Sequence, residues 1–270
     1  MSAPAGGTDA ADRSHRAAVD QQRERAVWER HAAWWQREFT AGADPEYEHQ
    51  ILPLAARHLE GARRVLDIGC GEGQVARTAG MSGTRRVVGV DPAAAQLAEA
   101  TRRDGPVRYV RATAGALPIA PSTVDAALSC LVLEHISDLD GALDEVARVL
   151  VPGGRFLLFL NHPLLQTPGS GWIDDQVVEP PEQYWRIGAY LREQVTVEQV
   201  DAGVRLPFFH RPLGRYVNAL AHRGLVITHM EEPAPPAELL VDGPRYAGVA
   251  EIPRLLFLRA ELVGGSAGRR

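Results

Sequence analysis

Three glycines at alternate positions join a short apolar run to a helical segment. The run Val65-Leu66-Asp67-Ile68 leads into Gly69-Cys70-Gly71-Glu72-Gly73, and the pattern predicts a helix over residues 73–81. Glycine adopts positive φ and lets the backbone approach a ligand closely. The first turn of the following helix presents unpaired N–H groups above the turn. The segment therefore predicts a ligand-binding turn between a strand and a helix.

Strand-like and helix-like segments alternate on both sides of this turn. Helices of this length between short Val- and Leu-rich strands favour βαβ units in a doubly wound parallel sheet. The strands are predicted at 65–68, 87–90, 107–110, 124–129 and 155–160, and the helices between them at 73–81, 93–103 and 139–150. A helix at 213–223 and strands at 225–230 and 255–262 complete the α/β part.

The remaining segments differ in composition from this core. Residues 13–62 have helical patterns that suit a lid, and residues 163–212 are rich in Pro, Gly, Trp and Tyr, as in a long insertion after the fifth strand. The expected division is a disordered N-terminus at 1–12, a lid at 13–62, a ligand-binding core at 63–162, a substrate-side insertion at 163–212, a C-terminal part of the same domain at 213–264 and a flexible tail at 265–270.

Carboxylates around the glycines narrow the class of ligand that this turn can bind. Asp91 ends the second predicted strand, where a carboxylate accepts hydrogen bonds from ribose hydroxyls. A dinucleotide fingerprint requires glycine at position 74, where this chain has Gln74. Asp67 would repel a pyrophosphate but suits a ligand with an ammonium group, such as S-adenosylmethionine. A nicotinamide dehydrogenase is therefore disfavoured.

Five motifs in order over residues 65–160 resemble those of the class I S-adenosylmethionine-dependent methyltransferases, of the small-molecule type. They are Val65–Gly73, Val87–Pro92, Ala116–Ile119 with Val124–Leu128, Leu131–Ile136, and Ala147–Arg155. The resemblance implies a mostly parallel seven-stranded α/β sheet and S-adenosylmethionine as cofactor, with S-adenosylhomocysteine as product.

The resemblance also implies which residues hold the cofactor. The expected cofactor-binding residues are Asp67, Gly69, Cys70, Gly71, Gly73, Asp91, Pro92, Thr113, Ala114 and Leu131. Thr113 stands where the family often has an acidic residue near the adenine, so adenine recognition is expected to pass to its hydroxyl or to neighbouring backbone.

Histidines and aromatic residues outside the motifs are the candidates for acceptor chemistry. Methyl transfer is an in-line displacement, and a base is needed only when the acceptor still carries its proton. His210 is the preferred base, ahead of His162 and His135; the alternative is that His210 and Arg211 brace the insertion. The expected substrate-binding residues are Trp35, Tyr47, Trp172, Tyr184 and Arg211, although packing of the lid, or a homodimer contact through the insertion, explains the aromatic residues almost equally well.

Composition limits the function classes. The net charge of −5 disfavours nucleic-acid binding by bulk electrostatics, and no apolar run approaches the ~20 residues that a transmembrane helix needs. The two cysteines do not suggest a zinc site, so no metal is expected, and a cytoplasmic protein with a small-molecule substrate is predicted. The alternatives are an RNA or protein methyltransferase, or a fold relative that uses the bound cofactor for other chemistry such as cyclisation.

Overall fold

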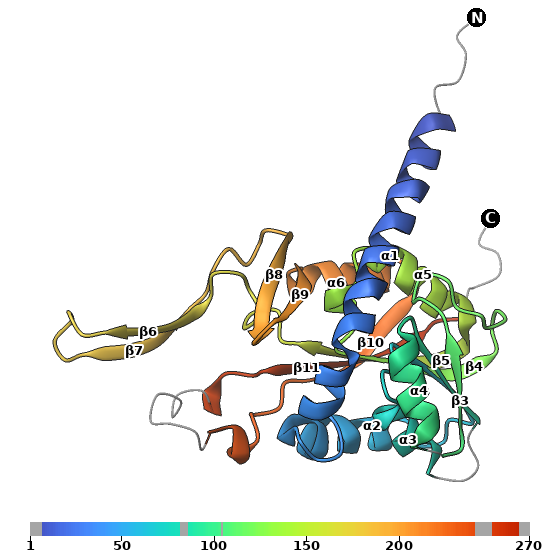
Figure 1. The fold of residues 1–270 in the computed structure, drawn as a ribbon, viewed down its shortest axis with the longest axis horizontal. Coiled ribbons are helices and arrows are strands. Elements are labelled where there is room, and N and C mark those ends of the chain that lie inside the picture. The colour runs from blue at the N-terminus through green and yellow to red at the C-terminus, as the bar shows by residue number, and fades with distance from the viewer. Residues whose placement is uncertain (1–6, 82–85, 104, 241–249, 265–270) are drawn as a thin grey trace, which may run out of the picture.

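The structure is a computed structural model that describes residues 7–81, 86–103, 105–240 and 250–264. Its centre is a seven-stranded sheet in the order β10-β11-β5-β4-β1-β2-β3 (Figure 1). The pairs from β3 to β5 are parallel, whereas β11 runs antiparallel to both β5 and β10. The predicted α/β class, with a doubly wound and mostly parallel seven-stranded sheet, is confirmed.

The strands lie close to their predicted positions. They are β1 Arg64–Ile68, β2 Arg86–Asp91, β3 Val107–Arg111, β4 Val124–Cys130, β5 Leu150–Asn161, β10 Leu225–Glu231 and β11 Leu255–Leu262. β5 begins five residues before its predicted start because Leu150 already pairs with Val124, and an irregularity then shifts the register before Arg155 pairs with Ala126.

Successive side chains of a strand point to opposite faces of the sheet. Both faces therefore carry side chains to be buried, and helices cover both. On one face Leu66 and Leu158 pack with residues of α5 (Leu139–Val149) and α6 (Leu213–Ala221). On the other face Val65 and Leu157 pack with residues of the π-helical segment η1 (Tyr47–Ile51), α2 (Leu52–His58) and α3 (Gln74–Gly80). The central strands are therefore buried on both sides, as their continuous apolar sequence predicts.

The N-terminal segment forms one long helix, α1 (Gly7–Glu38), whose C-terminal half crosses the α/β body (Figure 1). α1 begins before Ser14, where the helical pattern was expected to start, so residues 7–12 of the segment expected to be disordered are helical. Residues 1–6 and the expected flexible tail at 265–270 lie outside the described residues. No helix among the described residues is long and apolar enough to cross a membrane.

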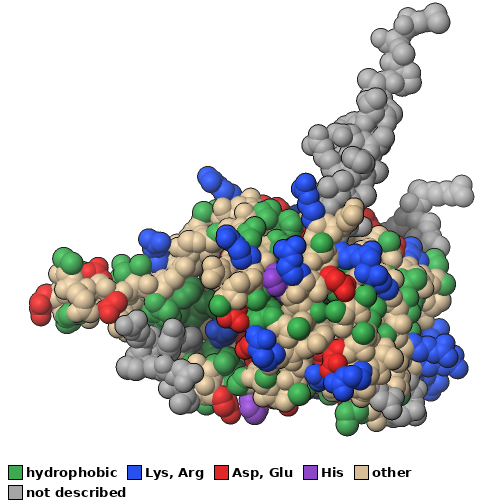
Figure 2. Space-filling view, viewed as in Figure 1, with side chains coloured by type: hydrophobic (Ala, Val, Ile, Leu, Met, Phe, Trp, Pro, Cys, Tyr) green, Lys and Arg blue, Asp and Glu red, His purple; other side chains and the backbone are tan. Residues whose placement is uncertain are grey.

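Two hairpins make up the insertion. The β6–β7 hairpin (Gly171–Asp175 and Glu182–Arg186) projects away from the body, at the left of Figures 1 and 2, and the β8–β9 hairpin (Gln194–Asp201 and Val204–His210) lies against α1. Trp34 of α1 packs on Leu206 and Phe208, and its Nε1 donates a hydrogen bond to Asp201 Oδ2 at 2.9 Å. The lid and the insertion therefore support each other.

The turn after β1 needs glycine for two different reasons. Gly69 and Gly73 have φ of 73° and 84°, a region that favours glycine. A Cβ on Gly73 would also lie 2.2 Å from the Tyr109 hydroxyl oxygen, and one on Gly69 would lie 2.4 Å from a methyl carbon of Val132. The sequence of the turn is therefore set by both backbone conformation and close packing.

We expect Gly73→Ala to lower the free energy of unfolding by about 2–4 kcal/mol, the sum of a left-handed backbone cost and overpacking against Tyr109. Gly153→Ala is the matched control, because Gly153 has φ of 76° but nothing within 4 Å of its added Cβ, and it should cost only about 1–2 kcal/mol. Chemical denaturation of both variants measures the difference, and equal losses would contradict the packing role.

Candidate functional site

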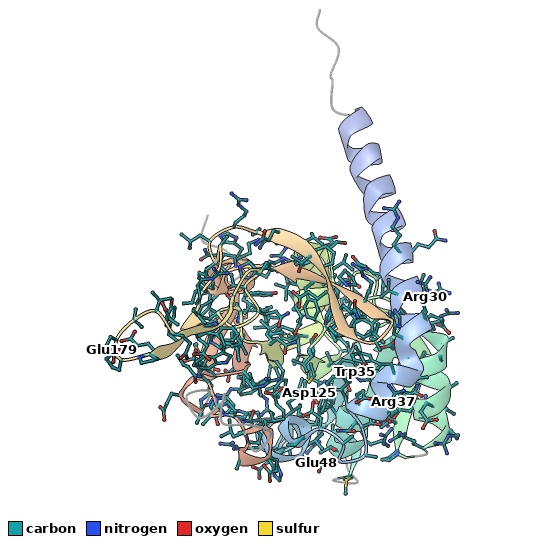
Figure 3. The ribbon with its side chains drawn as sticks, turned by 60° about the vertical axis from the view of Figure 1, so that its left-hand side comes forward. Arg30, Trp35, Arg37, Glu48, Asp125 and Glu179 are labelled. Carbon is teal, nitrogen blue, oxygen red and sulfur yellow. The ribbon has the colours of Figure 1, made fainter. Side chains whose placement is uncertain are left out.

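A cavity lies at the carboxyl ends of β1, β2 and β4, beneath the C-terminal half of α1. Ligands of open α/β sheets bind at this edge. The predicted site residues that line it are Trp35, Tyr47, Asp67, Gly69, Cys70, Gly71, Asp91, Pro92, Thr113, Ala114, Leu131 and His135. Twelve residues that are distant in sequence thus meet in one cavity, and Figure 3 marks where Trp35 lies on α1.

Asp91 connects the glycine turn to the next helix. Its Oδ2 accepts a hydrogen bond from Gly71 N at 2.9 Å, and its Oδ1 accepts one from Ala93 N at 2.8 Å. Burial raises the pKa of Asp91 to about 6, and the two N–H groups oppose that rise. The carboxylate is therefore held in a fixed orientation at the rim of the cavity, with lone pairs remaining on both oxygens.

Asp67 is a buried residue in the wall of the same cavity. Its Oδ2 has no hydrogen-bond partner among the described residues. Burial, then the negative charges of Asp91 and Glu72, raise its pKa to about 8, while the Ala76 N–H acts in the opposite direction. A buried carboxyl without a partner is costly to ionise, so this position favours a ligand that brings a positive charge.

Glu72 is a further buried carboxyl in the cavity wall, but it has its own cations. Its Oε2 lies 2.7 Å from Arg77 Nη2 and 3.0 Å from Arg103 Nε. These two arginines neutralise Glu72, whereas Asp67 has no such ion pair among the described residues. Of the two carboxyls, Asp67 is therefore the one that remains available to a ligand.

Leu131 marks backbone strain where β4 ends. It is a buried, non-glycine residue with φ of 54°, and its N–H donates to Phe159 O at 3.0 Å. A bulky residue in this conformation is uncommon and costs free energy, and such residues concentrate at functional sites. The bend brings Leu131 and Val132 into the wall of the cavity.

The lid is attached to the core by contacts that the sequence analysis missed. α4 (Ala94–Arg102) has no side-chain cap from its own N-cap residue, Ala93. Instead Glu29 of α1 accepts hydrogen bonds from Ala94 N at 2.6 Å and Ala95 N at 3.1 Å. Gln36 donates to Gln96 Oε1 at 2.9 Å. The absence of Ser, Thr, Asp or Asn immediately before α4 was the one signal that its cap comes from elsewhere.

Other lining residues also escaped the sequence analysis. Trp28 of α1, Phe39 just after it, Gln96 of α4 and Val132 after β4 all line the cavity. Trp28, Phe39 and Gln96 lie outside every motif, whereas Val132 lies within the Leu131–Ile136 motif, where only Leu131 was singled out. Trp28 reaches the cavity because the C-terminal half of α1 packs on the core.

His135 is the predicted catalytic histidine that lines the cavity. It packs between Trp28 and Phe208, at ring-centroid distances of 4.9 and 4.5 Å, and its Nδ1 lies 2.8 Å from the carbonyl oxygen of Pro207. Burial lowers its pKa to about 4, so the ring is neutral at physiological pH. Because Nδ1 donates its proton to a carbonyl, Nε2 is the unprotonated nitrogen.

The other two histidines are engaged elsewhere and are not among the residues that line the cavity. His210 Nε2 lies 2.8 Å from Tyr190 O, within the insertion. His162 Nε2 lies 2.7 Å from Glu232 Oε1, and its Nδ1 accepts a hydrogen bond from Leu164 N. Both side chains bind segments of the fold to one another.

Four more of the predicted site residues lie outside the cavity lining. Gly73 faces Tyr109 instead, and buried Arg211 donates to the carbonyl oxygens of Leu133, Ile136 and Ser137. Trp172 and Tyr184 lie in the β6–β7 hairpin, whose connecting loop contains Glu179 (Figure 3). Trp172 packs there edge to face against Trp185. The structure thus separates the aromatic residues of the lid from those of the hairpin.

Comparison with known proteins agrees with this geometry. A family described as "Methyltransferase domain" matches residues 66–158. A ubiquinone/menaquinone biosynthesis C-methyltransferase of Serratia proteamaculans is 31% identical over 152 residues, which cover 49% of this chain and 59% of the relative. A ubiquinone biosynthesis O-methyltransferase of Rhizobium rhizogenes is 39% identical over 105 residues, covering 38% of this chain and 42% of that protein. The matches thus span less than two thirds of either relative.

A solved structure matches over a longer range. An S-adenosylmethionine-dependent methyltransferase from Mesorhizobium loti superposes with a TM-score of 0.66 and 29% identity, over 79% of this chain and 99% of that protein. The likeness therefore extends beyond the motifs of residues 65–160 to most of the fold.

We expect Asp67→Asn to stabilise the ligand-free protein more at pH 8 than at pH 5. A folded-state pKa of about 8, against 3.8 ordinarily, means that the folded chain binds more protons than the unfolded chain in this range. The stability of the unmodified chain therefore falls as pH rises through that window. The gain from the substitution should grow by at least about 1.4 kcal/mol between the two pH values, the free energy of one pKa unit.

Denaturation at both pH values measures this change. Asp125→Asn is the control, because the Asp125 pKa is lowered, chiefly by hydrogen bonds from Arg64 and Arg63 that outweigh its burial. Asp125 stops stabilising the fold only as the pH falls below the ordinary pKa of its carboxyl. Asp125→Asn should therefore lower the free energy of unfolding by the same amount at pH 5 and at pH 8. A pH-independent effect of Asp67→Asn would show that Asp67 is ionised throughout.

Proposed function

Because the chain belongs to the class I S-adenosylmethionine-dependent methyltransferase family, we propose that it transfers a methyl group from S-adenosylmethionine to a small organic acceptor. The observation that carries this proposal is the buried Asp67 carboxyl, whose Oδ2 has no hydrogen-bond partner among the described residues, in a cavity that Asp91 also lines. One carboxyl suits a cationic amino-acid group and the other suits ribose hydroxyls. A pyrophosphate would be repelled by both.

The residues present fit this cofactor. We infer that Asp91 holds the ribose hydroxyls, that Asp67 faces the ammonium end, and that the backbone of Gly69, Cys70 and Gly71 lines the space between them. Thr113 and Ala114 also line the cavity, which supports the adenine contacts that we propose for them. When bound, S-adenosylmethionine supplies an electrophilic methyl group on a sulfonium.

The lid excludes water from the reacting groups. Trp28, Trp35 and Tyr47 line the cavity from the N-terminal segment, and Trp35 stacks on Phe39 at a centroid distance of 4.3 Å. Aromatic faces attract a cation by roughly 0.5–2 kcal/mol, depending on desolvation. We infer that the lid both dries the site and favours the positive charge of the donor.

We propose that His135 is the histidine that contacts the acceptor. It lines the cavity, and its unprotonated Nε2 can accept a hydrogen bond from an acceptor hydroxyl. A pKa of about 4 makes it a weak base, so it positions the acceptor more than it removes a proton. His210, the histidine preferred from sequence, holds the Tyr190 carbonyl instead, and this favours a bracing role for it.

The acceptor is proposed to be a small, largely apolar molecule methylated at carbon or oxygen. The names of two relatives describe C- and O-methyltransferases of ubiquinone biosynthesis, and the lid is aromatic on its cavity side. We further propose a cytoplasmic protein without a nucleic-acid partner, consistent with its net charge of −5 and its two free, buried cysteines. The exposed β6–β7 hairpin leaves a homodimer contact as a proposal.

Binding of S-adenosylmethionine at pH 7 should release close to one proton per molecule bound. A cation at Asp67 favours its ionised form, and the pKa of Asp67 in the free protein is about 8. Calorimetry in buffers of different ionisation enthalpy measures the proton count. Asp67→Asn should abolish the release, and Asp91→Ala should weaken binding more than tenfold. Tight binding of NAD without a response to S-adenosylmethionine would contradict the cofactor assignment.

Methyl transfer itself is tested with labelled cofactor and a panel of phenols, indoles, carboxylates and a tRNA pool. We expect label in a small molecule, and we expect His135→Gln to lower turnover at least tenfold while cofactor affinity changes less than threefold. His210→Gln should lower turnover less, and exposed His222→Gln is the control.

Three outcomes would contradict these proposals. Label confined to tRNA would overturn the small-molecule acceptor. Cofactor binding without transfer to any acceptor would favour non-methylating chemistry. Normal turnover in His135→Gln would remove the role proposed for that histidine.

A further inference from the structure

Two histidines and a glutamate meet on the sheet, away from the cofactor cavity. His58 is the last residue of α2, and His229 and Glu231 lie on β10. One potential ligand atom from each of the three side chains lies within 4.8 Å of the other two. None of the three is among the residues that line the cavity, so the cofactor site does not explain the cluster.

The strand geometry puts both β10 side chains on one face. His229 and Glu231 are two residues apart, and alternate residues of a strand point the same way. His229 Nε2 lies 3.0 Å from Glu231 Oε2. The His58 and His229 ring centroids are 4.8 Å apart, and Phe257 packs against His58 with a centroid distance of 4.7 Å. The His58 ring is therefore held in place by its packing against Phe257.

His58 has a polar atom that the protein leaves unsatisfied. The residue is only 7% exposed, and its Nε2 has no hydrogen-bond partner among the described residues. Buried polar atoms without a partner are rare and costly, and a bound ion or water is one explanation for them. His229 and Glu231, which are partly exposed, complete a set of three potential metal ligands in which the buried His58 ring is held in place.

The second carboxylate oxygen of Glu231 has its own partner. Its Oε1 lies 3.7 Å from Arg57 Nη2, while its Oε2 faces His229. An outer partner of this kind orients a metal-binding carboxylate and leaves one oxygen free to coordinate. The arrangement thus contains both the ligands and a group that orients one of them.

We propose that His58, His229 and Glu231 bind a divalent transition metal ion, with Zn²⁺ as the best match. Two imidazole nitrogens and one carboxylate oxygen are a known zinc donor set, and water completes the tetrahedron. Metal–ligand bonds of about 2.0–2.2 Å place tetrahedral ligands about 3.4 Å apart. The cluster must therefore contract slightly, which rotation of the more exposed His229 and Glu231 side chains allows.

The proposed ion would join two distant parts of the chain. α2 belongs to the N-terminal helical segment, whereas β10 lies at the edge of the sheet beyond antiparallel β11. A metal that binds only the folded chain stabilises it by mass action. Zn²⁺ should therefore raise the unfolding temperature as well as bind.

The test is a Zn²⁺ titration of the chelator-treated full chain against a competing chromophoric chelator, followed by a Co²⁺ titration. We expect one Zn²⁺ per chain with Kd of about 10 μM or tighter, a raised unfolding temperature, and the intense visible absorption of tetrahedral Co²⁺. His229→Gln and Glu231→Gln should each weaken Zn²⁺ binding at least tenfold and remove the thermal shift. His222→Gln is the matched control, because His222 is an exposed histidine after α6, and it should bind like the unmodified chain.

His229 and Glu231 are the variants of choice because they are only partly buried, whereas His58→Gln changes a buried position. Folding of each variant is checked by circular dichroism before titration. Absence of Zn²⁺ binding in the unmodified chain would overturn the proposal. Undiminished binding in both β10 variants would also overturn it, since other histidines would then hold the metal.

Discussion

The two hydrogen bonds that the Asp91 carboxylate accepts, from Gly71 N and Ala93 N, are the interaction on which the site depends. They join the glycine turn after β1 to the chain that leads into α4, across the ends of two adjacent parallel strands. A buried carboxylate with two backbone donors has a fixed orientation, so the turn and the helix start cannot move independently of it. The glycine turn and the start of α4 are thereby held together on one side of the cavity, which Asp67 also lines.

The cover of that cavity depends on the N-terminal helix and on the β8–β9 hairpin that supports it. Glu29 supplies the cap that α4 lacks, and Trp34 anchors α1 on the β8–β9 hairpin. The same hairpin presses Phe208 against His135 and provides the carbonyl that fixes its tautomer. The N-terminal helix therefore lines the cavity opposite the parallel core, and the insertion supports it from behind by packing on Trp34 and His135. This division explains why the motifs of residues 65–160 identify the donor and say little about the acceptor.

Sequence reasoning worked best where local pattern and global fold agree. The central strands were predicted to within a few residues, because buried parallel strands are apolar throughout, and the glycine turn, Asp67 and Asp91 were found from their positions at strand ends. It worked least well for side chains whose partners are distant in sequence. His162, at the carboxyl edge of the sheet, and His210, between the insertion and a helix, both carry the right chemistry, yet tertiary hydrogen bonds engage both elsewhere. Trp28 and Glu29 had no motif to mark them.

By itself, the sequence determined the strand–turn–helix that we propose binds the cofactor, because φ preferences, apolar runs and strand-end carboxylates are local properties of the chain. Only the tertiary structure decided which aromatic residues line the cavity, which of the three candidate histidines faces it, and that the buried Asp67 carboxyl there has no ion pair among the described residues. The same holds for His58 and His229, which are 4.8 Å apart between ring centroids in the fold and far apart in the sequence. Their spacing along the chain does not predict this proximity, because it arises only when α2 and β10 come together in the fold.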